Sequence, residues 1–153
     1  MTGPTGAPEV PAPDRGFPVE EFEARAAAAQ LLMAEGSLNA LLVCTEPEVQ
    51  YLTGFHTPFW QSPTRPWFVV LPAEGRPVAV IPGIGASAMA TTWVDDIRTW
   101  PAPHPADDGL QLLADTLQEI TGSTTEGPVR VGLPMGHETH VRMPLADLDD
   151  LRE

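Results

Sequence analysis

Apolar positions recur at two different spacings along the chain, and the spacings predict a series of helices and strands. Helical spacing predicts a first helix between Pro18 and Gly36, with acidic side chains in its first turn. The expected buried positions of this helix are Phe22, Ala26, Ala29, Leu32 and Met33.

The sequence predicts five short strands, at residues 40–44, 67–71, 77–81, 96–100 and 129–133. A turn at Glu74 and Gly75 makes the second and third runs a hairpin. Further helices are expected at 46–52 (capped by Thr45 and stopped by Gly54), 83–92, from Asp108 or Gly109 to 120, and 144–153. Helices that alternate with strands and a single hairpin predict an α/β fold with a mixed sheet.

The composition and the net charge of the chain exclude several classes of protein. Residues 1–16 are dominated by Pro, Gly, Thr and Ala and predict a mobile tail before one domain at 17–153. The net charge is −13, from 21 acidic residues against eight arginines, which disfavours binding to nucleic acid. No apolar run approaches the roughly 20 residues needed to cross a bilayer. The single cysteine, Cys44, excludes an internal disulfide, and without a leader-like N-terminus we expect a cytoplasmic protein.

The middle third of the chain differs from both ends. Residues 50–100 carry three acidic residues and three arginines, and they hold eight of the ten aromatic residues. These aromatics form either a buried sheet or a recognition surface. The same alternatives apply to the Pro-rich loop at 55–66, where Trp60 and Arg65 either pack on their own sheet or meet a partner carboxylate.

Two motifs are weak candidates for chemistry. The string from Gly83 to Ala88 matches the loose dinucleotide pattern G-x-G-x-x-A, but Pro82 and the preceding hairpin favour a plain turn into a helix. His137, Glu138 and His140 lack the i, i+4 spacing of a zinc protease helix, so a loop is favoured over a metal site. Cys44 has no neighbouring cation or histidine in sequence, and nucleophilic catalysis is unsupported.

Three segments resemble the N-terminal domain of the creatinase/prolidase family. They are Glu48-Val-Gln-Tyr-Leu-Thr-Gly-Phe55, Arg65-Pro-Trp-Phe-Val-Val-Leu-Pro72 and Pro77-Val-Ala-Val-Ile-Pro82. The resemblance extends over roughly residues 17–153. It implies a three-layer α/β/α domain with a mixed sheet, followed in the parent protein by a catalytic domain that is absent from this chain.

The resemblance also implies a role. The catalytic domain of the family holds two divalent metal ions (Mn, Co or Zn), and none of their ligands is carried over to this chain. In the creatinase branch, this domain reaches into the neighbouring subunit's pocket with an arginine and an aromatic residue. Arg65 matches the arginine, Phe59 or Trp60 the aromatic residue, and His56 lies on the same loop.

The resemblance therefore implies a non-catalytic domain of an Xaa-Pro peptidase. This domain would serve homodimer assembly and substrate selection, and its partners would be its own catalytic domain and a second subunit. A stand-alone interaction module that dimerises through the aromatic middle third is the alternative. A small hydrolase that uses His137 and His140 is a third interpretation.

Overall fold

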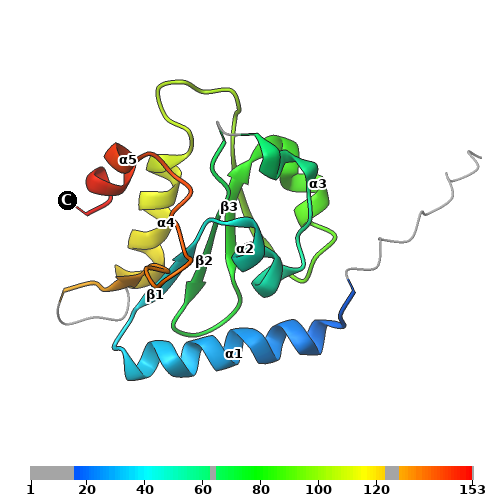
Figure 1. The fold of residues 1–153 in the computed structure, drawn as a ribbon, viewed down its shortest axis with the longest axis vertical. Helices are drawn as coiled ribbons and strands as arrows, with labels where there is room; N and C mark the ends of the chain where they lie inside the picture. Colours follow the sequence, from blue (N-terminus) through cyan, green and yellow to red (C-terminus); the bar gives the residue numbers. More distant parts are fainter. Residues whose placement is uncertain (1–15, 63–64, 123–127, 153) are drawn as a thin grey trace, which may run out of the picture.

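The computed structural model describes residues 16–62, 65–122 and 128–152. Its centre is a sheet of five strands, β1 (Ala40–Val43), β2 (Phe68–Pro72), β3 (Val78–Pro82), β4 (Asp96–Trp100) and β5 (Val131–Gly132), in the order β4-β3-β2-β1-β5. β2 runs antiparallel to β1 and β3, whereas β4 and β5 run parallel to their neighbours. The predicted mixed sheet is confirmed, and β1, β3, β4 and β5 end at the same edge (Figure 1).

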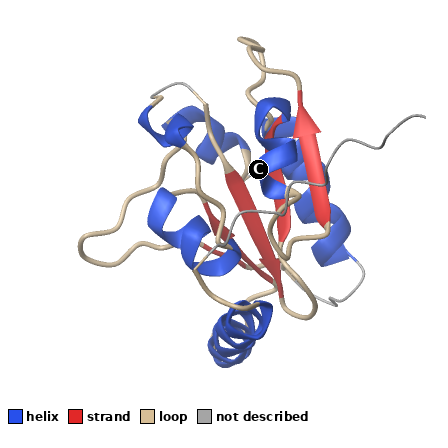
Figure 2. Ribbon diagram, turned by 90° about the vertical axis from the view of Figure 1, so that its right-hand side faces the viewer, coloured by secondary structure: helices blue, strands red, loops and turns tan. Residues whose placement is uncertain are grey.

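Helices cover both faces of the sheet, as the three-layer prediction requires (Figure 2). One face packs against α1 (Val19–Glu35), α2 (Glu46–Thr53) and α3 (Ala86–Met89), and the other against α4 (Leu110–Gly122) and α5 (Leu145–Asp150). Neighbouring residues of β2 face opposite cores: Val69 and Leu71 the first, Phe68 and Val70 the second. β1, β2 and β3 are continuous apolar runs because both faces of the sheet are buried there, whereas the edge strand β4 is more polar and only partly buried.

α1 packs on the sheet through one narrow stripe. Phe22, Ala26 and Met33 are its buried residues. Met33 lies about three full turns beyond Phe22 and therefore on the same side of the helix. The prediction that Leu32 shares this face is wrong, because one residue turns the helix by about 100° and leaves Leu32 67% exposed.

Local hydrogen bonds set the ends of α2 and α4. The Glu48 carboxylate accepts a bond of 3.3 Å from the backbone N–H of Thr45, and Gly54 ends α2 with a φ of 72°. Both predicted ends of α2 are thus confirmed. At α4 the cap is Asp107 instead of Asp108 or Gly109, because its Oδ1 accepts from the backbone N–H of Leu110 at 2.6 Å.

α3 is shorter than the helix predicted for 83–92. The turn begins as a 3₁₀ segment, η2 (Gly83–Gly85), and α3 ends at Met89. The hydroxyl of Thr92 donates to the Met89 carbonyl at 2.7 Å and takes an acceptor that a continuing helix would use.

The C-terminal elements are also shorter than predicted. β5 pairs with β1 over two residues instead of five, because Pro134 has no N–H to extend the ladder. α5 ends at Asp150, and the expected end at Glu153 lies outside the described residues. The tail predicted for residues 1–16 also lies outside them, apart from Gly16. In the described part of the chain, every helix is too short or too polar to cross a membrane.

Candidate functional site

The 55–66 loop reaches the edge of the sheet at which four strands have their carboxyl ends. β2 is antiparallel to its neighbours, so the loop that precedes it arrives at this edge (Figure 1). A 3₁₀ turn, η1 (Pro58–Gln61), shapes the loop. In α/β sheets, ligands bind outside the carboxyl ends of the strands. The loop thus carries the predicted site residues to the edge where a ligand is expected.

Trp67 is fully buried at the centre of an aromatic cluster, which consists of Phe55, Phe59, Trp60 and Trp67. The ring centroids of Phe55, Trp60 and Phe59 lie 5.4, 5.8 and 6.4 Å from that of Trp67. Phe59 stacks on Trp67 at an angle of 12° and is 37% exposed, whereas Trp60 is 8% exposed. The aromatic cluster therefore has a buried interior and an outer face made by Phe59.

Most aromatics of the middle third belong to the core, which confirms the buried-sheet interpretation for them. The buried ones are Phe55, Trp60, Trp67, Phe68, Trp93 and Trp100. Tyr51 and Phe59 remain exposed. A recognition surface built from this third of the chain is thus limited to two rings and to the arginines beside them.

Gly85 allows the Trp67 indole to pack against the start of α3. A Cβ atom at Gly85 would lie 2.2 Å from Cζ3 of Trp67, whereas one at Gly83 would only meet the Trp100 carbonyl oxygen at 3.6 Å. The prediction of a turn into a helix is confirmed at this motif. Close packing, and not phosphate binding, explains why a glycine occupies position 85.

Arg142 connects the segment after β5 to the 55–66 loop. Its guanidinium donates to the carbonyl oxygens of Arg65 at 2.5 Å, Trp60 at 3.4 Å and Ser62, and lies 5.4 Å from the centroid of the Trp60 ring. The backbone N–H of Arg142 donates to Sγ of Cys44 at 3.2 Å. Burial lowers the pKa of the Arg142 guanidinium. One cation thus fixes three carbonyl groups of the loop.

The four predicted site residues lie in four different environments. Trp60 is part of the core, and Phe59 forms the exposed face of the aromatic cluster. Arg65 is half-buried, and its guanidinium makes no hydrogen bond or ion pair with the residues that the structure describes. Nδ1 of His56 lies 4.0 Å from Oε1 of Glu46 on an exposed surface. All four residues come from the same loop, but Phe59, Trp60 and Arg65 lie in or beside the part that Arg142 contacts, whereas His56 faces Glu46 of α2.

Cys44 has the environment of a structural residue. Its side chain is 1% exposed at the end of β1, and burial raises the pKa of the thiol. The thiolate is the nucleophilic form of cysteine, and burial disfavours it at neutral pH. Cys44 is the small core residue that its apolar neighbours predict.

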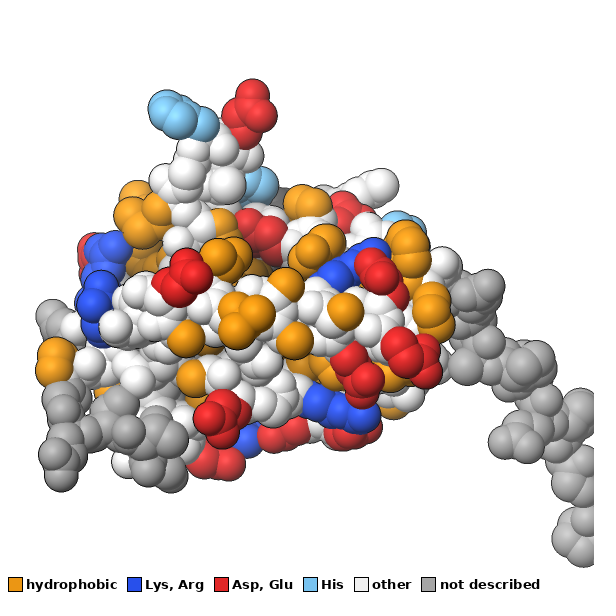
Figure 3. Space-filling model, turned by 90° about the horizontal axis from the view of Figure 1, so that it is seen from below, with side chains coloured by type: hydrophobic (Ala, Val, Ile, Leu, Met, Phe, Trp, Pro, Cys, Tyr) orange, Lys and Arg blue, Asp and Glu red, His pale blue; other side chains and the backbone are white. Residues whose placement is uncertain are grey.

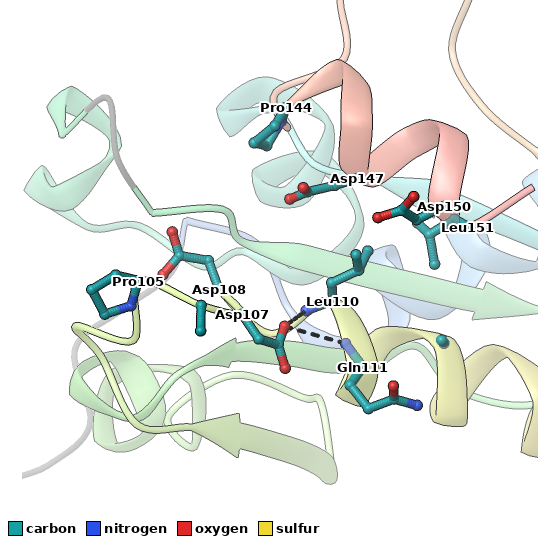
Figure 4. Close-up of a pocket in the computed structure, with 11 residues that line it drawn as sticks. Pro105, Asp107, Asp108, Leu110, Gln111, Pro144, Asp147, Asp150 and Leu151 are labelled. Carbon is teal, nitrogen blue, oxygen red and sulfur yellow. Dashed lines mark hydrogen bonds between the residues drawn. The ribbon is translucent and has the colours of Figure 1, made fainter.

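A second concave region lies between α4 and α5. The cavity measures about 510 Å³, and Asp107, Asp108, Asp147 and Asp150 line it (Figure 4). Burial and the three other carboxylates raise the pKa of Asp147. Among the described residues, no arginine forms an ion pair with any of these four aspartates. We call this region the acidic cavity.

The described residues do not fit a metal centre. His137 and His140 are exposed in the loop that follows β5, which confirms the loop interpretation of this segment. Across the ranges 16–62, 65–122 and 128–152, no three His, Cys, Asp or Glu side chains lie close enough together to hold an ion. This includes the aspartates of the acidic cavity.

Sequence reasoning missed Arg142. Its acceptors are carbonyl oxygens that lie 77 to 82 residues earlier in the chain, and any residue type supplies a carbonyl. No spacing or motif around position 142 therefore points to the loop. The one available signal is an arginine near apolar Val141 and Met143, which is too common a pattern to identify a buried cation.

Known proteins similar to the chain are prolidases and related dipeptidases. The dipeptidase PepE from Mycobacterium ulcerans matches with 23% identity and a TM-score of 0.64, over 89% of this chain and 34% of that one. Prolidase from Thermococcus sibiricus matches with 18% identity and a TM-score of 0.64, over 86% and 31%. The N-terminal, creatinase/prolidase-like domain of a metallopeptidase from Corynebacterium diphtheriae matches with 21% identity and a TM-score of 0.55, over 86% of both chains.

These structures share the fold of this chain, which spans about a third of the Mycobacterium ulcerans dipeptidase. No protein of curated function matches the sequence. The family model described as the creatinase/prolidase N-terminal domain matches residues 25–145, well over half of the chain. The chain therefore belongs to the creatinase/prolidase N-terminal domain family.

Proposed function

We propose that this chain is the non-catalytic N-terminal domain of a cytoplasmic metallohydrolase that cleaves Xaa-Pro peptides. In the proposed homodimer, the domain helps to assemble the subunits and contributes Arg65 to the substrate pocket of its partner. Two longer proteins support this proposal, the dipeptidase from Mycobacterium ulcerans and the prolidase from Thermococcus sibiricus. This chain matches 34% of the first and 31% of the second, so in each of them the matching fold is one part of a larger protein named for peptide cleavage.

The observation that carries the proposal is that the Arg65 guanidinium has no partner among the described residues, although its backbone is held by Arg142. The Arg65 side chain is half-buried and, within the part of the chain that the structure describes, remains free to bind a ligand. A guanidinium binds a carboxylate through two parallel hydrogen bonds, so the free carboxylate of a short peptide suits Arg65. Phe59 is exposed on the same loop and offers a ring for the apolar part of the substrate. Trp60 is buried and supports the loop instead.

The two divalent ions of the proposed enzyme belong to its catalytic domain. When bound there, they activate water for attack on the amide bond. The described residues of this chain lack a ligand set for them. The contribution of this chain is therefore to bind and orient the substrate.

Substitution of Arg65 in the complete enzyme tests the proposal. Loss of a charge-assisted bond predicts that Arg65→Ala raises KM for a dipeptide by roughly tenfold to a hundredfold, with partial recovery in Arg65→Lys. Arg130→Ala is the control, because Arg130 is likewise a loop arginine whose side chain has no partner among the described residues, although it is exposed. Unchanged kcat and KM in Arg65→Ala would refute the proposed role.

An interaction module is the second candidate, and the outer face of α1 favours it. No charged residue occurs between positions 26 and 34, and Leu31 and Leu32 are 70% and 67% exposed. Figure 3, seen from the side of α1, shows hydrophobic side chains spread over this surface with acidic ones around them. A helix that is apolar on both sides is commonly buried on both sides.

Sedimentation of the chain by itself tests this second candidate. An interaction module that self-associates forms dimers, and Leu31→Glu with Leu32→Glu returns it to monomers. Gln50→Glu adds a charge at an exposed site of α2 and serves as the control. A chain that remains monomeric at every accessible concentration eliminates self-association as its function.

A further inference from the structure

We propose that Arg142 is a positioning residue: its guanidinium holds the backbone of Trp60, Ser62 and Arg65 in the conformation that presents the Arg65 side chain to a substrate carboxylate. This inference rests on the proposed function, which assigns substrate binding to Arg65. The anchoring of the loop by Arg142 can be tested independently of that role.

The path of the chain gives Arg142 a position from which it can join three segments. In the sheet, β1 lies between β5 and β2. Arg142 follows β5, meets Cys44 at the end of β1 through its backbone N–H, and extends its side chain to the loop before β2. The contact therefore spans the sheet edge and links two loops that are distant in sequence.

The partners of Arg142 differ from those of most other arginines of the described chain. Arg25, Arg76, Arg98 and Arg152 pair with carboxylates at the surface. Arg142 instead donates to neutral carbonyl groups of Trp60, Ser62 and Arg65 and lies over the Trp60 ring. A planar fork of donors satisfies several carbonyls at once, which the single ammonium of a lysine does with poorer geometry. These contacts order a loop that lacks regular pairing.

The same contacts leave Arg65 in the state that a recognition residue requires. Its backbone carbonyl is fixed by Arg142, while its guanidinium has no partner among the described residues. Because Arg142 holds these backbone groups before the substrate arrives, binding does not have to supply the cost of ordering them. Loss of Arg142 should transfer that cost to the substrate and raise KM.

Amide hydrogen exchange on the chain tests the anchoring. We expect Arg142→Met to accelerate exchange at the amides of 59–62, Arg65 and Trp67 by about tenfold or more, with β3 amides unchanged and an intermediate effect in Arg142→Lys. Arg152→Met removes an exposed arginine paired with Asp149 and should leave the loop amides unchanged. Equal acceleration in β3 and the loop, in both Arg142 variants, would overturn the proposal, because Arg142 would then support the whole fold. Unchanged loop exchange would overturn it as well.

A double-mutant cycle in the complete enzyme tests the link to Arg65. We expect Arg142→Met to raise KM without lowering kcat, and to have a much smaller effect on KM when Arg65 is already alanine, because only the contact of Phe59 then remains to be positioned. If Arg65→Ala raises KM and the two effects multiply, Arg142 does not act through Arg65 and the positioning role is wrong. If Arg65→Ala has no effect, the proposed function fails, and the exchange experiment alone decides whether Arg142 anchors the loop.

Discussion

The aromatic cluster and the acidic cavity lie on opposite faces of the same sheet, and different forces govern them. In the cluster, Trp67 is fully buried and the cation of Arg142 is satisfied by carbonyl groups. In the cavity, four aspartates line a space of about 510 Å³ without an ion pair among the described residues (Figure 4). The cluster is held by packing, whereas like charges oppose the contact of α5 with α4.

The side chains of the aromatic cluster are also more deeply buried than those beside the acidic cavity. Trp67 packs against neighbouring aromatic rings and against Gly85. The space beside Gly85 is too small for an added methyl group. α5, by contrast, has no buried residue and touches the second core through half-buried Leu151. Small changes of side-chain volume in the aromatic cluster should therefore lower the free energy of unfolding. In the acidic cavity, small changes of charge should alter that free energy instead.

The largest expected effect is that of Gly85→Ala. The new Cβ would lie 2.2 Å from Cζ3 of Trp67, so overpacking should lower the free energy of unfolding by roughly 1–3 kcal/mol. Gly83→Ala is the matched control two residues away, because its Cβ meets nothing closer than 3.6 Å. Urea unfolding of both variants measures the difference. Equal stabilities would mean that Trp67 is not tightly packed.

A smaller effect of opposite sign is expected for Asp147→Asn. The pKa of Asp147 is raised in the folded protein, so the folded state binds the proton more tightly than the unfolded state. Stability therefore falls as the pH rises from the ordinary aspartate pKa through the raised value, and the penalty persists at neutral pH. Asparagine should remove that penalty and add roughly 0.3–0.5 kcal/mol at pH 7.

Two conditions sharpen the comparison at Asp147. The gain should vanish below the ordinary aspartate pKa, near 4, and should shrink in high salt. Asp149→Asn, on the same helix, removes a carboxylate that lies 3.2 Å from Nη1 of Arg152, and should bring no gain. If Asp149→Asn stabilises the protein as much as Asp147→Asn, net charge and not the cavity is responsible.

The sequence predicts the layers of this fold well, because burial on both faces makes β1, β2 and β3 continuous apolar runs. It predicts less well which residues of a helix are buried and how long the short strands are. Leu32 and Met33 are equally apolar, and the packing of Phe22 and Ala26 on the sheet decides which of the two is buried. The two-residue length of β5 likewise depends on the chain that follows it.

The site is less predictable than the fold. The Pro-rich loop makes Arg65 a candidate for contact with a carboxylate, but the role of Arg65 and Phe59 in a substrate pocket comes only from the family resemblance. Arg142 could not be found from the sequence because its acceptors are backbone atoms brought close only by the order of β5, β1 and β2. The sequence-based candidates with recognisable spacing, at Gly83 and His137, are a packed turn and an exposed loop.

Mixing of subunits is the most direct test of the central claim, that Arg65 serves the pocket of the neighbouring subunit. Subunits with Arg65→Ala and an intact catalytic domain are exchanged with subunits that have Arg65 and an inactivated catalytic domain. Each protein alone should be impaired. In mixed dimers the intact catalytic domain receives Arg65 from its partner. The KM of these intact sites should therefore return to the wild-type value. If mixing leaves KM at the value of Arg65→Ala alone, Arg65 does not act across the dimer and the claim is wrong.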